Sequence, residues 1–106
     1  MVDPVSAKRP VSMEELLSLA APIRDAVRRH HGTGKVMVFG SVARGDADAE
    51  SDVDLLVEFT PDATLIDLAG LELSLEGLLG RPVDVMSMGS QGRAVQHALR
   101  QALPLT

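Results

Sequence analysis

One run of the 106-residue sequence, Asp52–Phe59, restricts the possible folds more than any other feature. Aspartates occupy its first and third positions, and the rest of the run is almost entirely apolar. This pattern predicts a central β-strand, because period-two alternation gives way to a stretch buried on both faces. Residues two apart in a strand point to the same side, so Asp52 and Asp54 share one face. Their repulsion and lost hydration need an offset, for which a divalent cation is the commonest candidate.

The segments around this run predict the rest of a small α/β (α+β) domain. Apolar runs at Val36–Phe39 and Val83–Met86 predict two further strands. Helical periodicity predicts three helices: one capped by Ser12 and interrupted by Pro22 near Ala21, one opened by Thr60-Pro61-Asp62 and running to about Leu79, and one over Ala94–Ala102. We therefore expect the order helix, strand, strand, helix, strand, helix, in which helices flank a small mixed β-sheet.

Length and composition fit one domain, which we expect over residues 11–106, after a flexible tail at residues 1–10. No stretch approaches the ~18 consecutive apolar residues of a membrane span, and the N-terminus lacks the apolar core of a secretory signal. We therefore expect a cytoplasmic protein with no membrane partner. The net charge of −5 and the absence of Trp and Tyr argue against direct nucleic-acid binding. Cysteine is also absent, which removes disulfides and Cys-based zinc sites.

A glycine–serine pair, Gly40-Ser41, follows the first predicted strand. A phosphate can approach the backbone closely at Gly40, and the hydroxyl of Ser41 can bind it. A neighbouring strand lies ~4.8 Å away, so Asp84 can join Asp52 and Asp54 on one face. Three carboxylates from two strands can hold two Mg²⁺ ions about 3.5–4 Å apart. The set predicts in-line transfer at a nucleotide phosphate, with Asp84 completing the metal site or accepting the acceptor's proton.

The string Gly-Ser-x-Ala-Arg-Gly-Asp, followed by Ser-Asp-x-Asp-Leu-Leu-Val, resembles the minimal nucleotidyltransferase branch of the polymerase β-like nucleotidyltransferase superfamily. The resemblance extends from Val36 to Met86. It implies a nucleotidyltransferase fold, Mg²⁺, ATP as the nucleoside triphosphate, a triphosphate site at Gly40 and Ser41, and metal and catalytic roles for Asp52, Asp54 and Asp84.

The same resemblance implies a partner protein. Many members of this branch are antitoxins encoded beside a helical HEPN ribonuclease toxin, and some transfer AMP to a tyrosine of that toxin. We therefore expect a hetero-oligomer with such a toxin. Because this chain contains no Tyr, a tyrosine acceptor must lie on another protein.

Several alternatives stay open at the level of sequence. The protein could neutralise its partner by occlusion without catalysis. It could also act on RNA ends or small molecules, although enzymes of those kinds generally carry an added domain. Arg44 either contacts the triphosphate or the acceptor, or is an ordinary solvated loop residue. The exposed side of the first or of the last predicted helix could form a partner interface, and the sequence does not choose between them.

Overall fold

The computed structural model describes residues 10–90 and 92–106, so the predicted tail lies outside the described residues except for Pro10. The elements in chain order are α1 (Met13–Ser18), α2 (Ala20–Arg29), β1 (Gly32–Phe39), α3 (Gly40–Arg44), β2 (Val53–Phe59), α4 (Leu65–Leu79), β3 (Val83–Ser87), α5 (Arg93–Gln101) and β4 (Leu103–Pro104).

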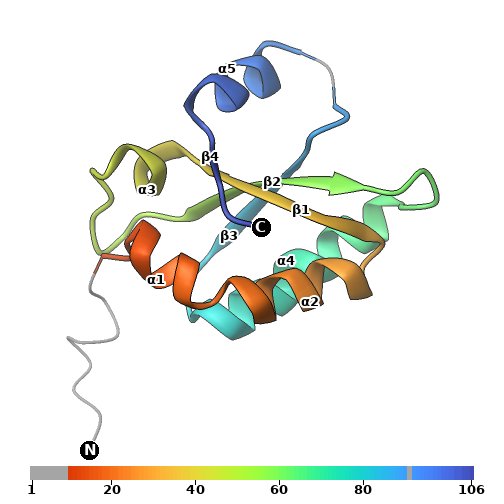
Figure 1. Ribbon diagram of the computed structural model, residues 1–106, viewed down its shortest axis with the longest axis horizontal. Coiled ribbons are helices and arrows are strands. Elements are labelled where there is room, and N and C mark those ends of the chain that lie inside the picture. Colours follow the sequence, from red (N-terminus) through yellow and green to blue (C-terminus); the bar gives the residue numbers. More distant parts are fainter. Residues whose placement is uncertain (1–9, 91) are drawn as a thin grey trace, which may run out of the picture.

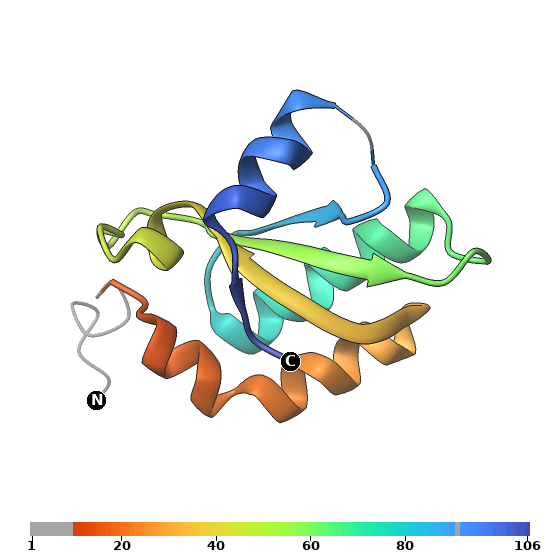
Figure 2. The same ribbon diagram turned by 45° about the horizontal axis from the view of Figure 1, so that its top comes forward.

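The four strands form one mixed sheet in the order β3-β2-β1-β4. β1 pairs antiparallel with both β2 and β4, whereas β2 and β3 run parallel. Helices α1, α2 and α4 cover one face of the sheet and α5 lies over the other (Figures 1 and 2). The expected fold class, a small mixed sheet flanked by helices, is therefore confirmed.

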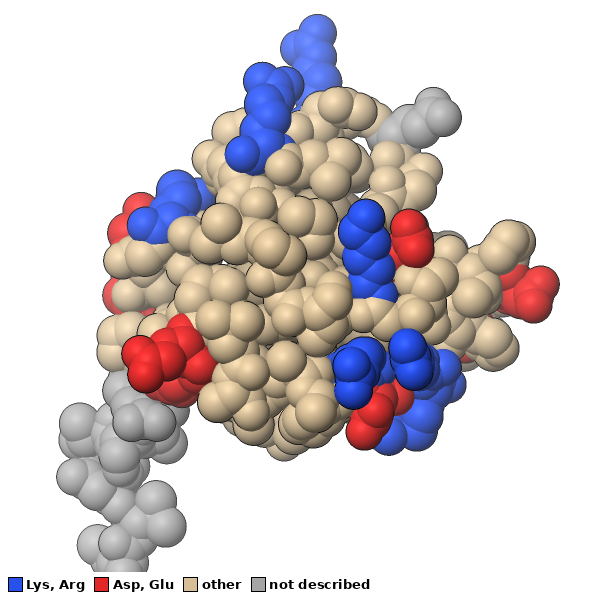
Figure 3. Space-filling model, in the orientation of Figure 1, with Lys and Arg blue, Asp and Glu red and all other residues tan. Residues whose placement is uncertain are grey.

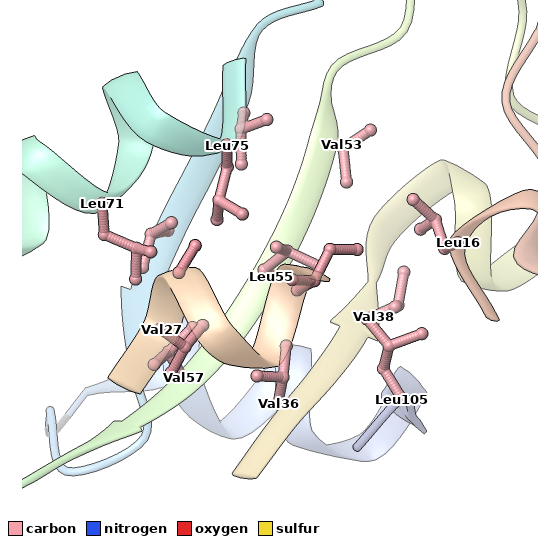
Figure 4. Packing of buried hydrophobic residues seen from close by; sticks show 14 of the residues in the cluster. Leu16, Val27, Val36, Val38, Val53, Leu55, Val57, Leu71, Leu75 and Leu105 are labelled. Atoms are coloured by element: carbon pink, nitrogen blue, oxygen red, sulfur yellow. The ribbon is translucent and has the colours of Figure 1, made fainter. Parts of the chain in front are cut away.

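Side-chain alternation along β2 divides the core between the two faces. Val53, Leu55 and Val57 belong to the large apolar cluster under α1, α2 and α4, whereas Leu56 belongs to a small cluster under α5. Figure 4 shows Leu71 and Leu75 of α4 gathered with Val27 of α2 around Leu55. These residues are completely buried, so this side of the sheet holds most of the core.

The first predicted helix is present, but its interruption lies three residues before Pro22. The Ser12 hydroxyl accepts a hydrogen bond from the Glu15 amide at 3.1 Å, as the capping signal predicts. The chain leaves the helix at Leu19 and resumes it at Ala20. Pro22 thus lies in the first turn of α2, where a missing N–H costs no intrahelical hydrogen bond.

The predicted start of α4 was wrong by one helical turn. Thr64, not Thr60, caps the helix, and Thr64 and Asp67 form a reciprocal capping box. Thr60 instead donates its amide to the His31 carbonyl at 2.8 Å, which holds it beside β1. The helix ends at Gly80 in the left-handed conformation, as predicted.

Two further differences concern β1 and β4. β1 begins at Gly32, four residues earlier than predicted, and the two-residue strand β4 was not predicted. Within the described part of the chain, no helix combines the length and apolar character needed to cross a bilayer.

Candidate active site

The register of β2 and β3 places two of the predicted site residues side by side. Asp54 and Asp84 are Cα partners in the parallel ladder. Their neighbours Val53, Leu55, Val83 and Val85 point into the large core, so both aspartates lie on the opposite face, near the beginnings of their strands. Asp52 directly precedes β2 and is exposed.

Gly40 approaches the same carboxylate from the neighbouring strand. Phe39, the last residue of β1, pairs with Asp54 across the antiparallel ladder, and the chain then turns into α3 at Gly40. Gly40 has φ +72°, and a Cβ added there would stand 2.3 Å from Oδ2 of Asp54. The left-handed conformation therefore favours glycine, and a side chain here would have to displace the Asp54 carboxylate. The first amides of α3, which include that of half-buried Ser41, have no acceptor within the helix.

The aspartates interact electrostatically as well as by register. Burial raises the pKa of Asp54 above its ordinary value, and the negative charges of Asp84 and Asp52 raise it further. The charge of Arg44 acts in the opposite direction. Asp84, Asp52 and Arg44 therefore all lie within electrostatic reach of Asp54.

Arg44 connects α3 to the last helix. Its guanidinium donates to Asp46 and to the side-chain oxygen of Gln101, both at 3.3 Å. Gln101 was not identified from the sequence. No local pattern could have connected it with Arg44, because the two residues are 57 positions apart. Arg44 is thus an exposed residue held over the aspartates' side of the sheet rather than a free loop side chain.

The carboxylates of Asp52, Asp54 and Asp84 are chemically suited to bind Mg²⁺. Carboxylates are the protein ligands that Mg²⁺ takes, and the repulsion between Asp54 and its two acidic neighbours is the cost that a cation would relieve. Over residues 10–90 and 92–106, however, no three acidic or histidine side chains stand close enough to form a ready metal cage. A bound nucleotide would have to supply part of the coordination, as Mg²⁺ sites commonly require.

Comparison with known proteins agrees with this geometry. The sequence profile of the nucleotidyltransferase domain matches residues 21–103. The chain belongs to this family. The expectation of a nucleotidyltransferase is thereby confirmed, since the matched region contains both the Gly40 turn and all three aspartates.

Two relatives and one solved structure are especially similar. The protein adenylyltransferase MntA of Thermococcus cleftensis is 38% identical over 80 residues, which cover 76% of this chain and 81% of the relative. A Methanocaldococcus jannaschii protein assigned as a protein adenylyltransferase is 43% identical over 60 residues, 57% of this chain and 64% of its own. A structure assigned as a minimal nucleotidyltransferase is 45% identical, with a TM-score of 0.75 over 90% of this chain and 97% of that one.

A more distant structure shares the fold. It is a toxin–antitoxin solved with AMP-PNP, 21% identical, with a TM-score of 0.70 over 82% of this chain and 72% of that one. The nucleotidyltransferase fold is therefore common to this chain and to that assembly.

Proposed function

We propose that this protein is an Mg²⁺-dependent adenylyltransferase that moves AMP from ATP to a tyrosine hydroxyl of a HEPN ribonuclease toxin, and so acts as an antitoxin. The observation that carries the proposal is the pairing of Asp54 with Asp84 against the Gly40 turn. Two relatives carry the adenylyltransferase assignment, and the distant toxin–antitoxin of the same fold was solved with an ATP analogue. Because its substrate is ATP, we propose that it works in the cytoplasm.

Each candidate residue has a role in this proposal. The turn at Gly40 and Ser41 binds the β- and γ-phosphates through backbone amides and a hydroxyl. Asp52, Asp54 and Asp84 would hold two Mg²⁺ ions, which when bound neutralise the phosphates and the departing pyrophosphate. In this proposal Asp84 also accepts the proton of the attacking hydroxyl. Arg44, which donates to Gln101, would contact a phosphate of the nucleotide.

The transfer involves one bond made and one bond broken. The acceptor oxygen bonds to the α-phosphorus, and the bond between that phosphorus and the pyrophosphate oxygen breaks. The chain contains no Tyr, so a tyrosine acceptor comes from the partner and self-modification at tyrosine is impossible.

Incubation with Mg²⁺, ATP labelled at the α-phosphate and the toxin encoded beside this chain tests the proposal. We expect label on the toxin, and mass spectrometry should place the AMP on a tyrosine. ATP labelled at the γ-phosphate is the control and should transfer nothing.

The Asp52→Asn/Asp54→Asn double variant separates catalysis from occlusion. If transfer neutralises the toxin, this variant should still form a complex but should no longer protect cells. Neutralisation by occlusion would be favoured by two results together: the double variant protects cells fully, and the wild-type protein transfers no label to the toxin.

A further inference from the structure

The charged side chains of helix α4 form hydrogen bonds with other parts of the fold. Asp67 belongs to the capping box and accepts a hydrogen bond from Nδ1 of His31 at 2.9 Å. Glu72 accepts from the Val85 amide at 2.8 Å, and Glu76 accepts from the Val83 amide at 3.3 Å. No other residue of this 15-residue helix is charged. Its solvent side is therefore left without a single charge.

Large apolar residues occupy that solvent side. Ile66 is 83% exposed and Leu73 is 71% exposed, and both lie on one side of the helix with exposed Ala69. We call Ile66, Ala69 and Leu73 the α4 stripe. Gly77, one turn beyond Leu73, has open space where a side chain would be. Surface helices normally show a polar face to water, so an apolar stripe on the solvent side of a helix indicates a covered surface.

A cavity of about 550 Å³ adjoins the beginning of the stripe. Leu65, 83% exposed and next to Ile66, forms part of its wall with Phe59, Leu68 and Ser87. The Thr60 hydroxyl in the same wall is buried and has no hydrogen-bond partner among the described residues. The cavity lies at the ends of β2 and β3 that are far from Asp54 and Asp84. It is therefore separate from the nucleotide site.

We propose that the α4 stripe and this cavity together bind one amphipathic helix of a partner protein, whose bulky aromatic side chain enters the cavity. A second copy of this chain fits poorly as the occupant. It has no Trp or Tyr, and its two Phe residues lie within β1 and β2, so it offers no exposed aromatic anchor.

Positive charge beside the α4 stripe indicates that the partner helix carries acidic residues. The adjacent helix α2 exposes Arg24, Arg28 and Arg29 against one acid, Asp25. Figure 3 shows these basic side chains gathered over α2, although the chain as a whole is acidic. A partner helix with acidic residues along one border would complement this flank.

This inference rests on the proposed function only in that it assigns the toxin as the partner. The stripe and the aspartates lie on opposite faces of the sheet, so a helix docked on the stripe leaves the nucleotide site open, and the acceptor tyrosine comes from another segment of the toxin. Different experimental results would therefore refute the docking proposal and the proposed function.

The test uses the full chain and the toxin encoded beside it. Affinity is measured by titration calorimetry for the wild type, for Leu73→Glu and for the control Leu17→Glu, which alters a leucine on α1 that is 51% exposed. We expect Leu73→Glu to weaken binding by at least about tenfold and Leu17→Glu to leave it unchanged. Ser90→Trp, which puts a ring at the wall of the cavity, should weaken binding as well. Matching thermal unfolding curves establish that each variant is folded.

Three results would overturn the proposal: equal affinity for Leu73→Glu and the wild type, no complex with the wild type, or a wild-type homodimer that Leu73→Glu converts to a monomer. Transfer of the α-phosphate label to the toxin in any of these cases would leave the proposed function intact. Conversely, stripe-dependent binding without label transfer would remove the catalytic proposal and keep the docking surface.

Discussion

The two faces of the sheet differ in how fully they are covered. Among the described residues, sixteen that are buried form one continuous cluster on the face under α1, α2 and α4. On the face under α5, the same part of the chain buries only Leu56, Val95 and Ala98 together. Asp54 and Asp84 lie on this second, thinly covered face. The molecule therefore concentrates its packing on one side of the sheet and leaves carboxylates, with an unfavourable mutual charge, accessible on the other.

The largest expected effect is on the thinly covered face. Asp54→Asn should reduce AMP transfer about 10³-fold, because it removes the charge at the centre of the acidic set. The same change should raise the melting temperature by roughly 2–4 °C, since it relieves burial of a charge and repulsion from Asp84 and Asp52. The stability gain is small because the side chain stays partly in solvent. Label transfer and calorimetric melting measure the two effects, and a destabilised Asp54→Asn protein would contradict the division of roles between the faces.

Adjacent leucines on opposite faces sharpen the comparison. Leu55 and Leu56 are both completely buried, but Leu55 faces the large cluster and Leu56 the small one. We expect Leu55→Ala to cost about 3–5 kcal/mol and Leu56→Ala about 2–3 kcal/mol, because the methionines around Leu56 can move into the space. Urea denaturation of both variants provides the measurement. Equal losses would mean that the small cluster is as tightly packed as the large one.

Gly40 tests the boundary between strand and site. Gly40→Ala should cost about 1–3 kcal/mol and impair transfer, because a left-handed residue is strained and its Cβ would displace the Asp54 carboxylate. Gly45→Ala is the matched control, since Gly45 has φ +81° and open space around it. Urea denaturation should show a comparable conformational cost for the control, and label transfer should show normal activity. A control that lost activity as severely would refute the importance of the contact with Asp54.

The smallest effect concerns the contact between His31, in the turn that joins α2 to β1, and Asp67 of α4. The hydrogen bond to Asp67 raises the pKa of His31 above 6.5, so its contribution is complete below that pH and is lost as pH rises through the raised value. The bond to His31 lowers the pKa of Asp67 below 3.8, so that contribution is present above 3.8 and is lost as pH falls through the lowered value. His31→Gln should therefore reduce stability more at pH 5.5 than at pH 8.5 in urea denaturation. A pH-independent difference would show that the charge of His31 contributes nothing to stability.

Local patterns predicted that Asp54 and Asp84 would lie side by side, because each pattern has one dominant structural meaning. The alternation at Asp52–Phe59 predicts a strand, and parallel pairing with the next strand brings Asp84 beside Asp54. The α4 start shows how competing signals can mislead. Pro61 favoured a cap at Thr60, but the box formed by Thr64 and Asp67 satisfies more backbone donors.

Other features depend on contacts that no local pattern contains. β4 is two residues long and exists through pairing with β1. Arg44 meets Gln101 only because α3 and α5 come together in the fold. The α4 stripe was missed because leucines on all sides of a helix give no periodic signal that separates its buried side from its exposed side.

The two glutamates of α4 have a consequence for assembly. β3 is the outermost strand on its side of the sheet, and Glu72 and Glu76 occupy the amides of Val85 and Val83 that a further strand would need. The opposite border is the two-residue β4, in which Pro104 has no amide to offer. Both margins thus discourage strand addition, which limits edge-to-edge aggregation and favours partners that recognise side chains over partners that extend the ladder.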